Sequence, residues 1–143
     1  MSTEENKVVA RHSFEEVMNN VNLAVIDEVF SPNYVLHAPS GPVHGLEGFK
    51  QFVLGYRSAF PDARYAIEEM IADQDKVVTR WSGTGTHLGE LMGIPPTGKR
   101  ATVTGISIGR YEGGKFVEEW LNFDALGMLQ QLGVISTPGQ ESK

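Results

Sequence analysis

The hydrophobic pattern of this chain changes at Pro61-Asp62, and that change limits the possible folds more than any other feature. Before it, apolar residues recur at helical spacing, most clearly over residues 46–60. After it come four long segments rich in β-branched and aromatic residues, predicted to be strands at 63–72, 76–87, 99–111 and 115–124. Helices followed by strands with tight turns predict an α+β domain with a curved, mostly antiparallel sheet.

The remaining elements are short. Helices are predicted at residues 4–21, 22–30, 46–60 and 125–132. Asn22 is a candidate N-cap for the second helix, and Gly133 fits the C′ position of the last. A short extended segment at 34–37 precedes a loop at 38–45 that holds two prolines. We expect a single domain over residues 1–133 and a disordered tail over 134–143.

The segment KFVEEWLNFD, residues 115–124, ends on a carboxylate just before the last helix. Strict strand alternation places Asp124 on one face with Asn122, Trp120, Glu118 and Phe116. An acid beside a large aromatic group in an apolar pocket has a raised pKa, which suits proton transfer near neutral pH. The alternative is that Asp124 is the N-cap of the following helix.

Pairing between the last two strands predicts a pocket beside Trp120. A two-residue turn at Gly113-Gly114 would place Tyr111 opposite Phe116. The same register sets small residues opposite larger ones, with Gly109 facing Glu118, Ser107 facing Trp120 and Gly105 facing Asn122. These small residues either leave room for a ligand or mark bulges and sheet curvature. The other face, with Thr104, Ile106, Ile108, Val117, Leu121 and Phe123, also needs a cover, and a homodimer packed sheet to sheet would supply it.

Two histidines are candidates for a role in chemistry, because histidine titrates near physiological pH. His37 ends the short extended segment, and His87 ends a strand at the start of the loop 88–98, on the same face as Trp81. No spacing of histidines or carboxylates is typical of a metal site. No glycine-rich phosphate loop or nucleophile elbow is present.

Composition excludes several classes of function. The chain has no cysteine, so disulfides and thiolate chemistry are absent. Its net charge is −6 and its basic residues are scattered, which argues against a nucleic-acid partner. No apolar run approaches the ~20 residues of a membrane helix, and the polar start MSTEENK does not resemble a secretion signal. A cytoplasmic location is expected.

Four segments resemble the SnoaL-like polyketide cyclase family, within the nuclear-transport-factor-like superfamily of α+β cones. They are FSPNYVLHAP, GLEGFKQFVLGYRSAFPD, GTHLGELMGIPPTGK and GGKFVEEWLNFDALGMLQQLG, and the resemblance covers residues 6–133. It implies a sheet wrapped around the N-terminal helices, with an internal pocket and no metal or other cofactor. Characterised members close a polyketide ester ring by an intramolecular aldol reaction. They use an aspartate at the position of Asp124 as acid/base and line the pocket with a polar residue at the position of His37.

Those members also carry a histidine on the preceding strand, where residues 101–111 offer Ser107 and Arg110 instead. The predicted reaction is proton transfer beside the carbonyl of a small hydrophobic ligand, with Asp124 as acid/base. His37 and His87 are the other predicted catalytic residues, and they would orient the substrate or stabilise the enolate. The predicted substrate contacts are Tyr34, Phe60, Trp81, Ser107, Trp120 and Asn122. The alternatives are an isomerase, a dehydratase or an epoxide hydrolase on the same fold, or a non-catalytic binding protein in which Asp124 is only a helix cap.

Overall fold

The computed structural model describes residues 2–136. The helices are α1 (Thr3–Ser13), the π-helix η1 (Phe14–Asn19), α2 (Leu23–Val29), α3 (Gly45–Ala59) and α4 (Ala125–Gln131). The strands are β1 (Phe30–Ala38), β2 (Gly41–His44), β3 (Arg64–Asp73), β4 (Lys76–Thr86), β5 (Arg100–Glu112) and β6 (Lys115–Phe123). This order confirms the prediction and adds β2 within the expected loop 38–45. Residues 137–143 of the predicted tail lie outside the described part of the chain.

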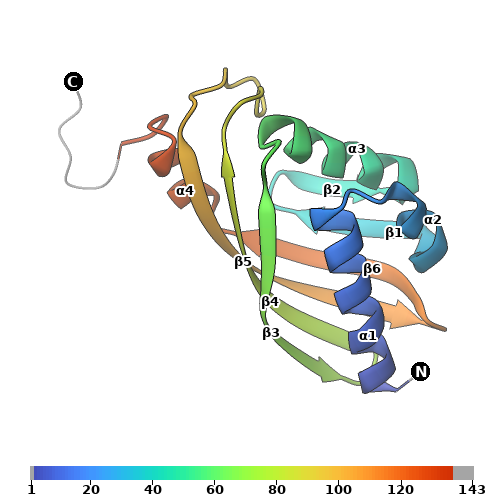
Figure 1. Cartoon of the computed structure of the whole chain (residues 1–143). Helices are drawn as coiled ribbons and strands as arrows, with labels where there is room; N and C mark the ends of the chain where they lie inside the picture. Colours follow the sequence, from blue (N-terminus) through green and yellow to red (C-terminus); the bar gives the residue numbers. More distant parts are fainter. Residues whose placement is uncertain (1, 137–143) are drawn as a thin grey trace.

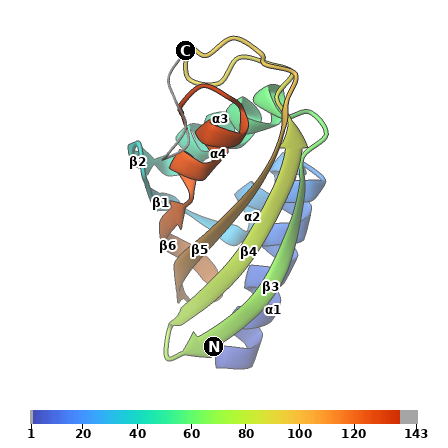
Figure 2. The same ribbon diagram turned by 90° about the vertical axis from the view of Figure 1, so that its left-hand side faces the viewer.

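All six strands form one sheet in the order β2-β1-β6-β5-β4-β3. Each neighbouring pair is antiparallel except β1 and β6, which are parallel. The sheet curves, and helices α1, α2 and α3 lie on its concave side (Figure 1). The view in Figure 2 looks onto β3, β4 and β5 from the convex side, with α1 and α2 behind them. The predicted α+β class and the curved, mostly antiparallel sheet are confirmed.

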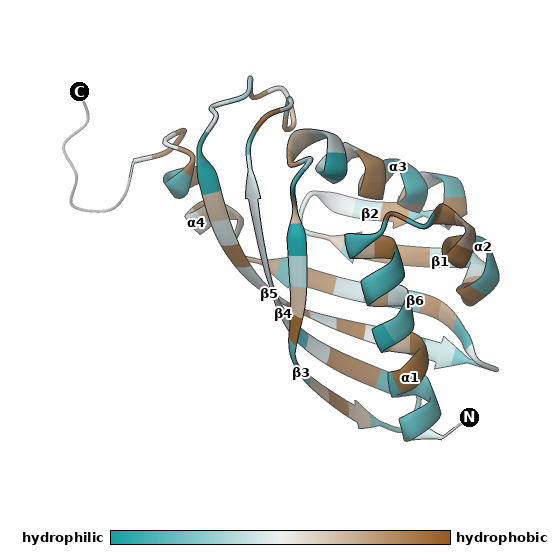
Figure 3. Cartoon of the chain, viewed as in Figure 1, coloured by the Kyte–Doolittle hydropathy of each residue, from teal (hydrophilic) through white to brown (hydrophobic). Residues whose placement is uncertain are grey.

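Apolar and polar residues alternate along the strands, as a sheet with one packed face requires (Figure 3). One buried cluster joins α1, η1, α2 and α3 to β1 and to the β5–β6 turn, and includes Val17, Ile26, Phe49 and Phe116. A second cluster lies between the end of α3, the loop after β4 and α4, and includes Ala59, Phe60, Leu91, Met128 and Leu132. Residues of both clusters line an internal cavity, which therefore lies where the two clusters meet.

A β-bulge in β6 reverses the predicted faces of that strand. The turn is as expected, since Gly113 and Gly114 have φ of 55° and 80° and Tyr111 pairs with Phe116. Arg110 then pairs with Glu118, so that Val117 has no opposite residue. One extra residue shifts the alternation by one position. Beyond the bulge Gly109 therefore faces Glu119, and the predicted pairing of Gly109 with Glu118 is wrong.

The bulge also changes the composition of the outer face. Thr104 and Ile106 lie on that face as predicted, and Ile106 is 50% exposed. Leu121 and Phe123, which were placed there too, instead line the internal cavity. The homodimer across this face stays a prediction.

Among the described helices, none has the length and apolar character needed to cross a membrane.

The predicted helix over residues 4–21 is divided into α1 and the π-helix η1. Arg57 of α3 holds the end of η1 by donating to the carbonyl oxygens of Met18 at 2.6 Å and Asn19 at 3.3 Å. The Asn19 amide accepts from the backbone N–H of Tyr65 at 2.8 Å and donates to its carbonyl at 2.9 Å. These bonds fasten the wide π turn between α3 and β3, where Val17 and Met18 form part of the cavity wall.

Candidate active site

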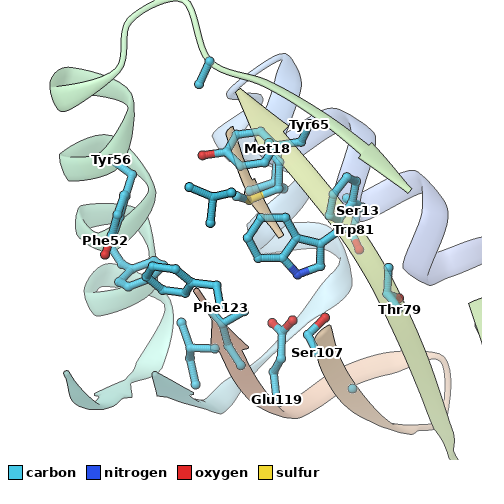
Figure 4. A pocket seen from close by; sticks show the side chains of 18 of the residues that line it. Ser13, Met18, Phe52, Tyr56, Tyr65, Thr79, Trp81, Ser107, Glu119 and Phe123 are labelled. Atoms are coloured by element: carbon cyan, nitrogen blue, oxygen red, sulfur yellow. The ribbon is translucent and has the colours of Figure 1, made fainter. Parts of the chain in front are cut away.

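The internal cavity lies between the concave face of the sheet and helices α1, η1 and α3 (Figure 4). The volume open to the centre of a water-sized sphere is about 130 Å³, well above the ~10–15 Å³ that one water needs. Most of the wall is apolar. The polar side chains in it are those of Ser13, Tyr56, Tyr65, Thr79, Trp81, Thr84, Ser107, Tyr111 and Glu119. Among the described residues of the wall, Glu119 is therefore the single charged side chain.

Glu119 points into the cavity from β6, just beyond the bulge, with Ser107 beside it (Figure 4). The hydroxyl of Tyr34 donates a hydrogen bond to its Oε1 at 2.7 Å. Burial raises the pKa of Glu119 to about 7, against smaller opposing effects of hydrogen bonds from Tyr34 and Ser107. A carboxyl group with this pKa is present in both protonation states at neutral pH, as an acid/base catalyst must be.

Tyr34 holds the carboxylate from behind rather than lining the cavity as predicted. Its side chain on β1 is fully buried, with 0% exposure. Its ring packs edge-on against Phe30 and Phe116, with centroids 4.8 Å and 5.5 Å away. Burial raises the pKa of Tyr34 well above its ordinary value, so the phenol stays protonated and keeps donating. The tyrosine thus fixes one carboxylate oxygen of Glu119 and leaves the other unengaged by it.

Replacing Tyr34 with Phe is expected to raise the pKa of Glu119 further. The hydrogen bond from Tyr34 stabilises the ionised carboxylate, and the variant lacks that bond. Stability should fall by about 1–3 kcal/mol, since a buried acceptor loses its partner. A carbon-13 NMR titration of the glutamate side chains measures the pKa. Tyr56→Phe is the matched control, because that cavity hydroxyl makes no bond to Glu119. An unchanged or lowered pKa in Tyr34→Phe would contradict this role.

Small residues on β5 do leave room on the inner face, as predicted, but Trp81 of β4 takes that room instead of Trp120. Trp81 pairs with Gly105, and a Cβ on Gly105 would stand 2.3 Å from Cζ2 of the indole. The adjacent pair on the same inner face is Thr79 and Ser107, and both side chains are buried. Trp81 and Ser107 are thus cavity residues, as the sequence predicted.

Asp124 lies at the N-terminus of α4 and not in the cavity wall. Its Oδ1 accepts a hydrogen bond from the backbone N–H of Gly127 at 2.9 Å. The side chain is exposed, and the cavity wall does not include it. The helix-cap alternative is therefore confirmed, and the predicted place of Asp124 beside Trp120 in a pocket is wrong. The cause is the bulge, because the predicted face assumed unbroken alternation.

His37, Trp120 and Asn122 lie on the outer face of the sheet, and none of them lines the cavity. The His37 ring stacks on Trp120 with centroids 5.4 Å apart, and its Nε2 lies 2.7 Å from Oε2 of Glu118. The hydrogen bond from His37 and the nearby Arg110 guanidinium lower the pKa of Glu118. Asn122 is exposed. The predicted convergence of His37 with the cavity is not found.

His87 is fully buried at the start of the loop after β4, yet it lies behind the cavity wall. The backbone N–H of Thr97 donates to its Nδ1 at 3.2 Å. His87 thus joins the two ends of the loop, and its ring packs against Phe60 with centroids 5.5 Å apart. Phe60 lines the cavity as predicted. The position of His87 supports a structural role in holding the loop.

Glu119 is not among the site residues predicted from the sequence, although a signal for it exists. Glu119 alternates with Leu121 and Phe123, which are the more apolar residues of the strand and therefore its better candidates for the packed face. Glu118, by contrast, alternates with Asn122 and Asp124. If Leu121 and Phe123, rather than Phe116, are taken to mark the packed face of the strand, Glu119 is predicted to face inward.

Comparisons with known proteins agree with the fold and the sequence segments. The family model of the SnoaL-like polyketide cyclases matches residues 8–132. AclR, a candidate hydroxylase from Streptomyces galilaeus, is 29% identical with a TM-score of 0.83 over 95% of this chain and 85% of its own. TsrD from Streptomyces laurentii is 27% identical with a TM-score of 0.84 over 94% of this chain and 99% of its own.

A candidate polyketide cyclase from Acidithiobacillus ferrooxidans is 34% identical with a TM-score of 0.80, covering 93% of this chain and 98% of its own. Among curated protein sequences, none matches the chain. The family match spans nearly all of the described elements, from α1 to α4. The chain belongs to the SnoaL-like polyketide cyclase family.

Proposed function

We propose that this protein catalyses proton transfer at a carbon beside a carbonyl group, with Glu119 as the acid/base. The observation that carries the proposal is the placement of one carboxyl group, that of Glu119, in an otherwise uncharged and largely apolar cavity. Burial there raises its pKa to about 7. A cyclase-type function agrees with the family of the chain. The proposed substrate is a small hydrophobic molecule with an enolisable carbonyl.

The reaction uses both protonation states of Glu119. The ionised carboxylate takes a proton from the α-carbon of the bound substrate and leaves an enolate. The new enolate carbon attacks an electrophilic carbonyl of the same molecule in an aldol closure, or takes a proton back in an isomerisation. In the aldol case, the protonated Glu119 returns its proton to the alkoxide that forms, so no proton is lost or gained overall. Tyr34 holds Oε1 throughout, which leaves the reacting oxygen fixed in direction.

The walls of the cavity supply the conditions for this chemistry. The aromatic rings of Phe52, Tyr56, Tyr65, Trp81 and Phe123 line the cavity, which suits an apolar ligand (Figure 4). Exclusion of water keeps the carboxylate poorly solvated and therefore basic. The same exclusion strengthens the electrostatic interactions that form with the enolate.

Deuterium exchange in D₂O tests this function without knowledge of the natural substrate. A panel of aryl ketones and β-keto esters is incubated with the protein, and loss of the α-proton signal is followed by NMR. We expect exchange above the buffer rate, with a kcat/KM that rises with pH and levels off above about 7 as Glu119 ionises. An enzyme-dependent rate that stays flat between pH 5 and 9 would contradict Glu119 as the base.

A second candidate function is non-catalytic binding of a small apolar ligand. The observation that favours it is that none of the four histidines of the chain lines the cavity, so the described wall offers Glu119 without a second titratable group of similar pKa. Such a protein would bind members of the ketone panel and leave their α-proton exchange at the buffer rate. The same experiment therefore separates the two functions.

A further inference from the structure

We infer that Trp81 binds the substrate carbonyl oxygen through its indole N–H, beside the carboxylate of Glu119. The inference deepens the proposed function and rests on it for the identity of the reacting group. It assigns a hydrogen-bonding role to a residue that would otherwise serve only as an apolar wall. It also narrows the ligand to one that carries a carbonyl acceptor at the end of an apolar body.

The position of the indole follows from its contacts on β5. A Cβ built on Gly105 would stand 2.3 Å from Cζ2 of Trp81 and 2.6 Å from Cε2, the carbon bonded to the indole nitrogen. The nitrogen edge of the ring therefore lies over β5 at Gly105, next to Ser107 on the same inner face. Figure 4 shows this edge turned toward the hydroxyl of Ser107 and the carboxylate of Glu119.

The indole N–H is free to bind a ligand. Tryptophan Nε1 can only donate, and a buried indole N–H normally finds an acceptor. Among the described residues, none accepts a hydrogen bond from the indole nitrogen of Trp81. This nitrogen is not fully buried either, so it is accessible from the cavity that Trp81 lines. Polar groups on the same face are the hydroxyls of Ser107 and Thr79 and the carboxyl of Glu119.

This arrangement sets a hydrogen-bond donor and a base beside each other on the wall of one cavity. A carbonyl oxygen that accepts from Trp81 would place its α-carbon toward Glu119, which is the geometry that enolisation needs. The bond would strengthen as negative charge develops on the oxygen, so Trp81 would stabilise the enolate more than the ketone. The position of the indole depends on the glycine at 105, because any side chain there would displace the ring.

Binding of two probes of similar shape tests the inference apart from catalysis. Acetophenone carries the carbonyl acceptor, and ethylbenzene replaces it with a methylene group. We expect wild type to bind acetophenone about 3- to 10-fold more tightly in calorimetry, the effect of one neutral hydrogen bond. Trp81→Phe keeps an aromatic ring and removes the N–H, so this preference should disappear. Trp120→Phe, the same change on the outer face, should keep it.

A nitrogen-15 NMR experiment supports the test even if Trp81→Phe does not fold. The chain has two tryptophans, so the single indole signal left in Trp120→Phe belongs to Trp81. Acetophenone should shift this signal downfield, and ethylbenzene should not. Equal binding of the two probes to wild type, or a preference that survives in Trp81→Phe, overturns the inference. Glu119→Gln should keep the ketone preference, so failure of the acid/base proposal would be seen separately, in the exchange assay alone.

Discussion

Replacing Glu119 with Gln is expected to lower kcat for α-proton exchange by about 10²–10⁴-fold, the usual contribution of one general acid/base. Glutamine keeps the size of the side chain and can still accept the hydrogen bond from Tyr34. It cannot take up a proton near pH 7, so the chemical step loses its base while the cavity keeps its shape. Ligand affinity should change little, because the apolar wall is untouched.

Asp124→Asn is the matched control, because it makes the same carboxylate-to-amide change five positions along the chain. Asparagine is as good an N-cap as aspartate, so α4 should keep its cap and activity should stay within about twofold. The family resemblance assigns the catalytic role to Asp124, and the two variants decide between the residues. A large loss in Asp124→Asn with full activity in Glu119→Gln would return the role to Asp124.

The same Glu119→Gln substitution is expected to make the protein more stable at alkaline pH, by up to about 3 kcal/mol at pH 8. Folding raises the pKa of Glu119 from 4.5 to about 7. Between these values the folded state binds more protons than the unfolded state, so the free energy of unfolding falls as pH rises through this window and levels off above it. Glutamine has no charge to bury, so the free energy of unfolding of the variant does not fall in this way as pH rises.

Urea unfolding at a series of pH values measures this effect. At pH 4, where Glu119 is mostly protonated in both states, wild type and Glu119→Gln should have nearly equal stability. The difference should grow between pH 4.5 and 7 and then stay constant. Asp124→Asn should retain the wild-type pH dependence, because Asp124 is exposed at a helix end. Parallel stability curves for wild type and Glu119→Gln across pH 4–9 would show that Glu119 is not buried as an acid.

The order of the long elements was predictable because local signals determine it. The apolar stripe of α3, the positive-φ glycines of the β5–β6 turn and Gly133 after α4 all occur where the sequence placed them. The π-helix η1 and strand β2 were missed. Each depends on tertiary contacts, such as the bonds from Arg57 to the end of η1 and the pairing of Val43 with Leu36.

The candidate site was harder to predict, because one unpaired residue decides it. Without the bulge at Val117, Glu118 and Trp120 would face inward and Glu119 outward. Nothing local marks Val117 as a bulge, since it is neither glycine nor proline. The bulge shifts the faces of β6 alone, so Trp81 of β4 and Ser107 of β5 still line the cavity as predicted. Phe60, the C-cap of α3, also lines it.

A carbon-13 NMR titration of the Glu119 carboxyl, assigned by its absence from the spectrum of Glu119→Gln, tests the acid/base role at the residue itself. We expect a midpoint near pH 7, because the carboxyl group is buried in an apolar cavity. Bound acetophenone should raise the midpoint further, since the ligand displaces water from the carboxylate. A midpoint in the ordinary range of glutamates, about 4.3, would contradict Glu119 as the acid/base of this protein.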